Sequence, residues 1–211
     1  MPEDIEVPFP PLRVCYHELI SSGIIDLLSM TRRFPIIHAR RNVTGAPPHG
    51  EEIDLEFSNG EHRTYRRMIQ PGHGAAYVVA LPDPDHVFLI REYSCGMDHY
   101  ELGPVKGRID PGETPVETAN REMMEEIGYG AKRLDYIRSI SLNPNYMTHA
   151  AELVVARDLY EQTAQGDEPE PLELIKWRLD DLESLLLRPD VTDGRAIAAL
   201  FIAREWLKSN P

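Results

Sequence analysis

From residue 35 onward, apolar and polar positions follow mainly the two-residue alternation that is typical of β-strands. Residues 51–70 predict two strands joined at Asn59-Gly60, a dipeptide that favours tight hairpin turns. Residues 75–93 predict a second pair, with its turn over residues 82–85. Further strands are predicted over residues 100–109, 133–143, 150–160 and 174–179, and residues 161–173 predict a polar loop interrupted by prolines.

Three segments carry helical signals instead. Thr114 is a good N-cap, Pro115 suits the first helical position, Glu117 completes a capping box with Thr114, and Gly128 fits the position after the last turn. Residues 180–189 and 193–210 predict two more helices, and the second is expected to bury one apolar stripe consisting of Ile197, Leu200, Phe201, Ala203 and Leu207. One helix among strands, closed by helices at the C-terminus, predicts an α+β fold or a three-layer α/β/α sandwich with a mixed or antiparallel sheet.

The first 34 residues differ from the rest of the chain. Residues 2–14 contain four prolines and show little periodicity, and residues 17–30 predict a short amphipathic helix. We therefore expect an appendage over residues 1–34 and a domain over residues 35–211. An alternative is that natural synthesis starts at Met30.

Composition narrows the class of protein. The 211 residues carry a formal net charge of -13, which argues against a sequence-independent nucleic-acid binder but permits an anionic substrate if a divalent cation is bound. The chain has two cysteines, far apart, which is typical of a reducing, cytoplasmic environment. It has neither a 20-residue apolar run nor a basic start with an apolar block, so we expect no membrane association and no secretory signal.

Acidic residues crowd the C-terminal half of the helix that begins after Thr114. Glu122 and Glu126 are four residues apart and share one face, and Glu125 lies beside them. Carboxylates at a helix C-terminus are electrostatically unfavourable. A solvated acidic face is one interpretation. A set of oxygen ligands for a hard divalent cation such as Mg²⁺ is the other.

The spacing of this segment resembles the Nudix box. Gly107 is followed after five residues by Glu113, and after seven more by residues 121–129 with the sequence REMMEEIGY. Every defined position of the Nudix motif is filled. The resemblance implies the Nudix α/β/α sandwich with a mixed sheet, a catalytic loop-helix-loop and an N-terminal antiparallel β segment. It also implies hydrolysis of a nucleoside diphosphate linked to another group.

The same resemblance assigns roles to residues of the box. Glu122 and Glu126 match the family's metal ligands, with Mg²⁺ as the expected cation and Mn²⁺ as the alternative. Glu125 matches a further ligand or a group that orients water, and Arg121 matches a residue that orients the helix by pairing with Glu113. Further implied roles are a metal contact from the backbone carbonyl of Lys106, a tight loop at Gly107 and Gly112, and a helix end at Gly128.

Residues outside the box suggest the substrate. Pro144 and Tyr146 follow the box by fifteen and seventeen residues, which resembles the marks of ADP-ribose pyrophosphatases and of diadenosine polyphosphate hydrolases respectively. Glu168 and Glu170 lie in the loop where related enzymes carry a catalytic base, and the sequence does not choose between them. Residues 36–208 are similar to the bacterial ADP compounds hydrolases of this family, which implies the substrates ADP-ribose, diadenosine triphosphate and NADH.

The resemblance also suggests substrate contacts and a homodimer. Arg91 and Glu92 end a predicted strand where dimeric relatives contact the substrate, and Glu101 is a further candidate. Relatives of this type exchange an N-terminal β segment, here residues 51–67, so we expect a homodimer acting on a small nucleotide substrate. The alternatives are a strict ADP-ribose pyrophosphatase, a strict dinucleoside polyphosphate hydrolase, a nucleoside triphosphatase, and a non-catalytic module that senses a nucleotide.

Overall fold

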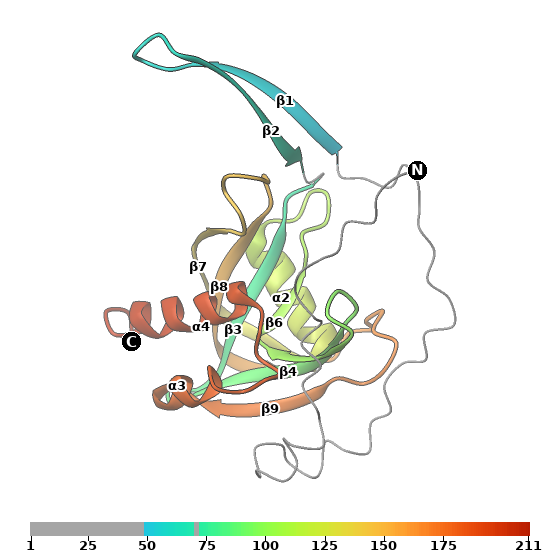
Figure 1. Cartoon of the computed structure of the whole chain (residues 1–211). Coiled ribbons are helices and arrows are strands. Elements are labelled where there is room, and N and C mark those ends of the chain that lie inside the picture. The colour runs from blue at the N-terminus through green and yellow to red at the C-terminus, as the bar shows by residue number, and fades with distance from the viewer. Residues whose placement is uncertain (1–48, 70–71) are drawn as a thin grey trace. The chain divides into compact units, whose positions relative to one another are not determined.

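The computed structural model describes residues 49–69 and 72–211 of the chain (Figure 1). The predicted helix over residues 17–30, and with it the appendage, lies outside the described residues. Strands β1 (His49–Glu56) and β2 (His62–Ile69) form the predicted antiparallel hairpin, with Asn59-Gly60 in its loop. Gly60 has a φ of 82°, a left-handed conformation that glycine adopts without strain.

A seven-stranded mixed sheet forms the centre of the domain. It contains β3 (Ala75–Asp83), β4 (His86–Ser94), β5 (His99–Gly103), β6 (Val105–Arg108), β7 (Tyr129–Ser141), β8 (Ala150–Glu161) and β9 (Glu173–Arg178). The order is β5-β4-β3-β8-β7, with β6 paired to β3 and β9 paired to β4. The β3–β8 pair is parallel and the other pairs are antiparallel, so the sheet is mixed, as predicted.

The single strand predicted over residues 100–109 is wrong in detail. Pro104 separates β5, which pairs with β4, from β6, which pairs with β3. Proline has no backbone N–H to donate to a ladder, so it marks the point where the chain changes its partner strand.

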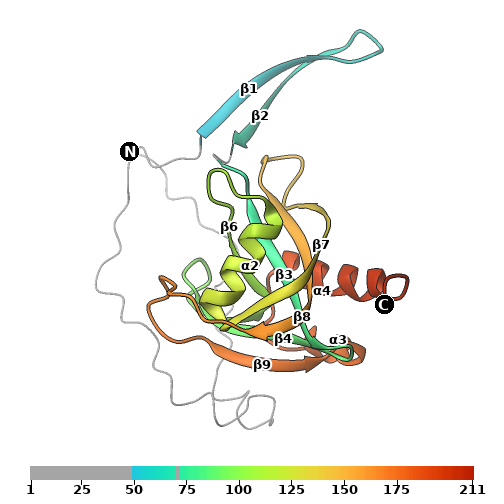
Figure 2. The same ribbon diagram turned by 180° about the vertical axis from the view of Figure 1, so that it is seen from behind.

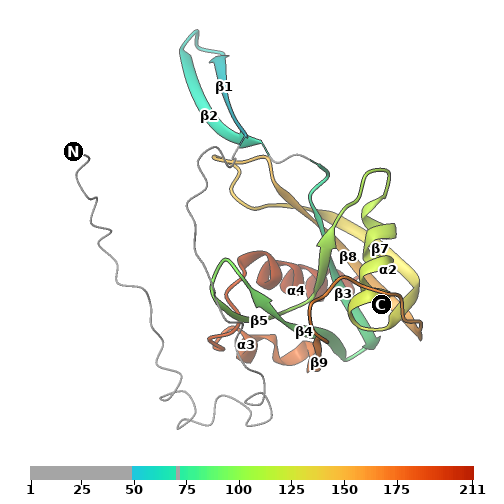
Figure 3. The same ribbon diagram turned by 90° about the vertical axis from the view of Figure 1, so that its right-hand side faces the viewer.

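Helices cover both faces of the sheet, which confirms the predicted sandwich. Figure 3 shows the strands between α2 (Pro115–Glu126) and α4 (Gly194–Leu207). Figures 1 and 2 show the same arrangement from the two faces of the sheet. Alternation along β3 explains the two cores. Ala76 and Val78 pack with α2, whereas Tyr77 and Val79 pack with α4.

Two predictions for the C-terminal helices need correction. The segment over residues 180–189 contains only a 3₁₀ turn (Leu179–Asp181) and the short α3 (Leu182–Leu185), because Pro189 disfavours helical backbone at the residue before it. The buried residues of α4 are Ala196, Ala199, Leu200 and Ala203. Ile197, Phe201 and Leu207 are only partly buried, because alanines allow the helix to approach the sheet closely along a neighbouring stripe.

Candidate active site

The sequence signals around α2 produce the predicted helix ends. The Thr114 hydroxyl accepts a hydrogen bond from the backbone N–H of Glu117 at 3.3 Å, and the Thr114 N–H donates to the Glu117 carboxylate at 2.8 Å. This reciprocal pair is a capping box, with Pro115 at the first helical position. The helix ends before Gly128, whose φ of 74° reverses the chain into β7.

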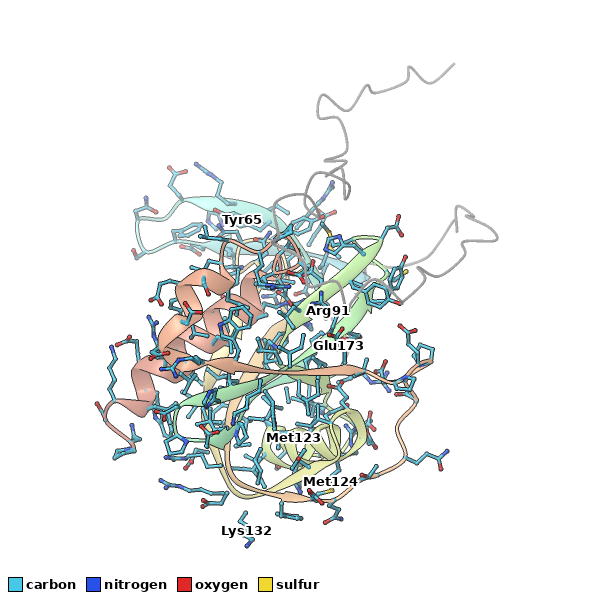
Figure 4. All side chains as sticks on the ribbon, turned by 90° about the horizontal axis from the view of Figure 1, so that it is seen from below. Tyr65, Arg91, Met123, Met124, Lys132 and Glu173 are labelled. Atoms are coloured by element: carbon cyan, nitrogen blue, oxygen red, sulfur yellow. The ribbon has the colours of Figure 1, made fainter. Side chains whose placement is uncertain are left out.

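One face of α2 anchors the helix and the other carries the acidic residues. Ala119 and Met123 are fully buried against the sheet, and Figure 4 labels Met123 beside its less buried neighbour Met124. Glu122, Glu125 and Glu126 line a cavity instead. Because the anchored face fixes the rotation of the helix, these carboxylates are held toward the cavity by packing on the other side.

The guanidinium of Arg121 lies among the carboxylates of the box. It donates to both carboxylate oxygens of Glu113, at 2.8 and 2.9 Å, and to Glu122 and Glu125 at 2.7 and 3.0 Å. A further bond of 3.1 Å reaches the backbone carbonyl of Arg108 at the end of β6. These hydrogen bonds lower the pKa of Glu113 to about 2, so this carboxylate stays charged and holds the loop against the helix.

Among the glutamates at the C-terminal end of α2, Glu126 is the one whose carboxylate has a buried oxygen, Oε2, without a hydrogen-bond partner among the described residues. Burial raises its pKa to about 9, the Lys106 ammonium opposes that rise, and Glu122 adds to it. Burial also raises the pKa of Glu122 and of Glu168. A buried carboxylate without a partner is costly, and a cation that enters the cavity would remove this cost.

Glycines bring the loop before α2 close to these side chains. Gly112, with a φ of 94°, turns the chain between Asp110 and Glu113. Gly107 on β6 packs directly against Glu122, since a Cβ atom at this position would lie 1.8 Å from the Glu122 carboxyl carbon. The site therefore requires a residue without a side chain at position 107.

The cavity beside α2 has a volume of about 970 Å³ and is lined from several elements. Besides the residues of α2, its walls include Glu92 of β4, Lys106 and Gly107 of β6, and Glu168 of the loop before β9. The Lys106 ammonium donates to the Glu92 carboxylate. Glu170 does not line this cavity, and its carboxylate accepts a hydrogen bond from the Tyr100 hydroxyl at 2.7 Å.

Other candidate residues lie elsewhere. Arg91 of β4 pairs with Glu173 of β9 at 3.1 Å and with Asp190, and Figure 4 shows Arg91 and Glu173 side by side. Glu101 lines a second cavity of about 320 Å³, where the backbone N–H of Thr192 donates to its carboxylate at 2.9 Å.

Pro144 and Tyr146 line neither of these two cavities. The Tyr146 side chain is 52% exposed, and its carbonyl accepts a hydrogen bond of 2.8 Å from Met68 at the end of β2. These two residues are therefore not gathered around the acidic cluster in the described part of the chain.

Several residues that line the large cavity were not predicted from the sequence, among them Arg195 and His149. Arg195 lies in the first turn of α4, where a cation faces the positive end of the helix dipole. This unfavourable position is a sequence signal that could have singled it out. His149 has no comparable signal, because its place beside Arg195 depends on the parallel pairing of β3 and β8.

The residues present fit a divalent metal ion. As the side chains stand, no group of three or more His, Cys, Asp or Glu residues within residues 49–69 and 72–211 is arranged around one metal-sized point. The Arg121 guanidinium donates hydrogen bonds to Glu122 and Glu125. The donors are nevertheless all carboxylate oxygens, and Glu126 has an unpartnered buried oxygen. Oxygen donors of this kind suit Mg²⁺ or Mn²⁺.

We expect Asp190→Asn to destabilise the fold by about 2 kcal/mol at pH 7, because the partly buried Arg188 guanidinium loses its carboxylate partner and Arg91 keeps only Glu173. Burial opposes ionisation of Asp190, but hydrogen bonds from Arg188 and Arg91 outweigh it and lower its pKa. The stabilisation is thus fully present above the unfolded pKa of about 4 and is lost as the pH falls further. Urea unfolding at pH 7 and at pH 3 measures this, and equal stability of variant and wild type at pH 7 would contradict the pairing.

Comparisons with known proteins agree with this geometry. The NUDIX domain model matches residues 71–201, and a model of the NudE-type Nudix hydrolase N-terminal domain matches residues 35–67. The chain is 48% identical over 158 residues to the ADP compounds hydrolase NudE of Escherichia coli (strain K12), covering 75% of this chain and 84% of that protein. It is 28% identical over 149 residues to the ADP-ribose pyrophosphatase of Bacillus subtilis (strain 168), covering 70% and 80%.

A solved structure is also similar. The crystal structure of an ADP compounds hydrolase matches with a TM-score of 0.66 and 46% sequence identity, covering 76% of this chain and 86% of that one. The Nudix model alone spans more than half of the chain, and it includes the whole of the acidic helix and its loop. The chain belongs to the Nudix hydrolase family.

Proposed function

We propose that this protein is an Mg²⁺-dependent pyrophosphohydrolase that cleaves ADP-linked compounds, such as ADP-ribose, diadenosine triphosphate and NADH, to AMP and the other phosphorylated half. The observation that carries the proposal is the unpartnered Glu126 carboxylate in the cavity formed by the Nudix helix. The names of the relatives support this substrate class, and Mn²⁺ is the alternative cation. In such a site a bound divalent cation neutralises the phosphates and lowers the pKa of water.

Glu122 and Glu126 are the proposed primary ligands, and Glu125 is a further ligand or orients the water. Arg121 fixes the helix through Glu113, and the Lys106 carbonyl stays a predicted metal contact. Hydrogen bonds from Arg121 orient the carboxylates of Glu122 and Glu125.

The structure favours Glu168 over Glu170 as the proposed general base. Glu168 lines the cavity, and its charge raises the pKa of Glu126 across that cavity. Burial raises the pKa of Glu168 itself, which favours proton uptake by this carboxylate. Glu170 is not among the residues that line the cavity, and it accepts a hydrogen bond from Tyr100.

Release of AMP from ADP-ribose, diadenosine triphosphate and NADH, measured by chromatography with and without Mg²⁺, tests the function. ATP and GTP serve as controls for a nucleoside triphosphatase. Cleavage of ADP-ribose alone, or of dinucleoside polyphosphates alone, would support the corresponding strict hydrolase. Tight binding of these nucleotides without turnover would support the sensing module instead.

We also propose that residues 35–211 form the functional domain and that it acts as a homodimer. The match of the N-terminal family model from residue 35 supports the boundary. The hairpin supports the dimer, because Ile53, Leu55 and Tyr65 project from one of its faces. Leu55 is 41% exposed and Tyr65 is 49% exposed, which leaves an apolar surface for a second copy to cover.

We expect the double variant Leu55→Lys/Tyr65→Lys to weaken the dimer by about 10²-fold or more, because two apolar side chains contribute a few kcal/mol when buried. Light scattering after size-exclusion chromatography measures the mass. The matched control Asp54→Lys/Thr64→Lys changes the charged face of the same strand pair and should leave the dimer intact. A monomeric wild type, or equal effects of the two double variants, would contradict the proposal.

A further inference from the structure

The part of the large cavity nearest α4 differs chemically from the part nearest α2. Arg195 and His149 line it together with Gly74, Ala75 and Tyr77. Tyr77 belongs to the core on the α4 face of the sheet, whereas Met123 belongs to the core on the α2 face. The cavity thus joins an acidic region, suited to metal ions, to a region with a cation and an imidazole that the proposed metal chemistry does not use.

The guanidinium of Arg195 is held in a fixed orientation. Its Nε and Nη2 atoms each donate to the Asp193 carboxylate at 3.0 Å, and its centre lies 5.3 Å from the centroid of the Tyr77 ring. The Tyr77 hydroxyl donates to the same carboxylate at 2.8 Å. The Nη1 atom has no hydrogen-bond partner among the residues that the structure describes. A planar group with oriented, unused donors is suited to phosphate recognition.

His149 provides a neutral polar group beside this cation. Its Nδ1 atom is buried and has no hydrogen-bond partner in the described structure. Burial lowers its pKa and the positive charge of Arg195 lowers it further, so the ring is uncharged at neutral pH. The His149 residue also lines the cavity, so a ligand hydroxyl that enters the cavity can meet the accessible part of this neutral ring.

The surroundings favour a sugar phosphate over a nucleobase. A base is usually held against an apolar or aromatic surface. Here the Tyr77 side chain is only 1% exposed and the Arg195 guanidinium lies over its ring, while Gly74 and Ala75 offer little apolar area. Cation, imidazole and small residues together suit an anionic group that carries hydroxyls.

We propose that Arg195 and His149 form the subsite for the sugar-phosphate half of the substrate, with Arg195 binding phosphate oxygens and His149 binding a sugar hydroxyl. The proposal rests on the proposed function, in which ADP-ribose is cut to AMP and ribose 5-phosphate. In this arrangement Arg195 is a binding residue on the opposite side of the reacting pyrophosphate from the Nudix glutamates.

Product binding tests this subsite independently of turnover. Arg195→Gln should weaken the binding of ribose 5-phosphate at least about tenfold and that of AMP less than about twofold, since only ribose 5-phosphate loses a charge-assisted contact. Isothermal titration measures both ligands. In hydrolysis, the KM for ADP-ribose should rise about as much as the product affinity falls, while kcat changes less. A wild type that binds ribose 5-phosphate but releases no AMP would overturn the proposed function and leave this subsite standing.

Matched variants separate binding from folding. Arg204→Gln removes an arginine from the same helix that is also paired with a carboxylate, Glu183, and lines neither cavity, so product binding should not change. Arg195→Lys should recover part of the lost affinity. His149→Ala should weaken ribose 5-phosphate about fivefold, because the neutral hydrogen bond is lost. Unchanged ribose 5-phosphate affinity in folded Arg195→Gln and in His149→Ala, or an equal loss for both products, would overturn the assignment.

Discussion

Replacement of Glu126 by glutamine is expected to lower kcat for ADP-ribose by about 10³-fold or more, which corresponds to roughly 4 kcal/mol of lost transition-state stabilisation. The Glu126 Oε2 atom is buried and has no hydrogen-bond partner in the described structure, so a cation that enters the cavity can bind this oxygen directly. Glutamine keeps the size of the side chain but cannot supply the charge. Steady-state AMP release at saturating Mg²⁺ measures the loss, and a loss below tenfold would contradict the assignment of Glu126 as a metal ligand.

Glu117→Gln is the matched control for this variant. Glu117 lies two turns earlier on the same helix and closes the capping box with Thr114. Glutamine serves in a capping box as well as glutamate does, so both folding and activity should stay near those of the wild type.

Thermal unfolding provides a second readout for Glu126→Gln. At pH 7 and without metal the variant should be more stable than the wild type, because burial raises the pKa of Glu126 to about 9 and folding must protonate a group that is ionised in the unfolded chain. Added Mg²⁺ should then raise the Tm of the wild type and of Glu117→Gln, but hardly that of Glu126→Gln. Equal Mg²⁺-induced shifts in all three proteins would place the cation elsewhere.

The parts of the fold that sequence reasoning predicted depend on local physical chemistry. The limits of α2 follow from Thr114, Pro115 and Gly128, whose effects act within one turn of the helix. The hairpin of β1 and β2 follows in the same way from the conformational preference of Asn59-Gly60. The spacing of the box places its glutamates on one helix face, so the acidic side of the cavity could also be predicted.

Features that depend on long-range pairing could not be predicted. The parallel contact between β3 and β8 brings His149 next to the start of β3, and nothing in the segment around His149 indicates this. Arg195 reaches the cavity because α4 packs on the face that Tyr77 presents. Local signals therefore identified the acidic half of the cavity, whereas the opposite half became visible only in the folded chain.

Pro104 illustrates an intermediate case. The sequence indicates extended structure on both sides of it, and a proline within a strand warns of an irregularity. Which partner each half takes is decided by the sheet, where β5 joins β4 and β6 joins β3. The change of partner strand places Gly107 of β6 against Glu122 of α2. The effect of this contact on kcat can be measured.

Gly107→Ala is expected to lower kcat by about 10²-fold while leaving the fold intact. An added Cβ atom would lie 1.8 Å from the Glu122 carboxyl carbon and 1.9 Å from its Oε1 atom, so the carboxylate must move away. The group that moves is the end of a flexible side chain, and Gly107 does not have a positive φ, so the backbone accepts alanine. AMP release together with the Tm of the variant distinguishes a displaced ligand from a damaged fold. Gly96→Ala, which adds a methyl group with no atom of the described structure within 4 Å, should change neither.

A double variant tests whether the loss of kcat in Gly107→Ala comes from displacement of Glu122. An added Cβ atom at position 107 would also lie 2.4 Å from the Glu122 Cγ atom, so only removal of the side chain beyond Cβ, in Glu122→Ala, makes room for it. If the methyl group acts only by displacing the Glu122 side chain, Gly107→Ala/Glu122→Ala should be about as active as Glu122→Ala alone, so the two changes would be strongly non-additive, as expected for residues in direct contact. Losses that simply multiply would mean that Gly107 acts through the backbone of β6 and not through the carboxylate that it faces.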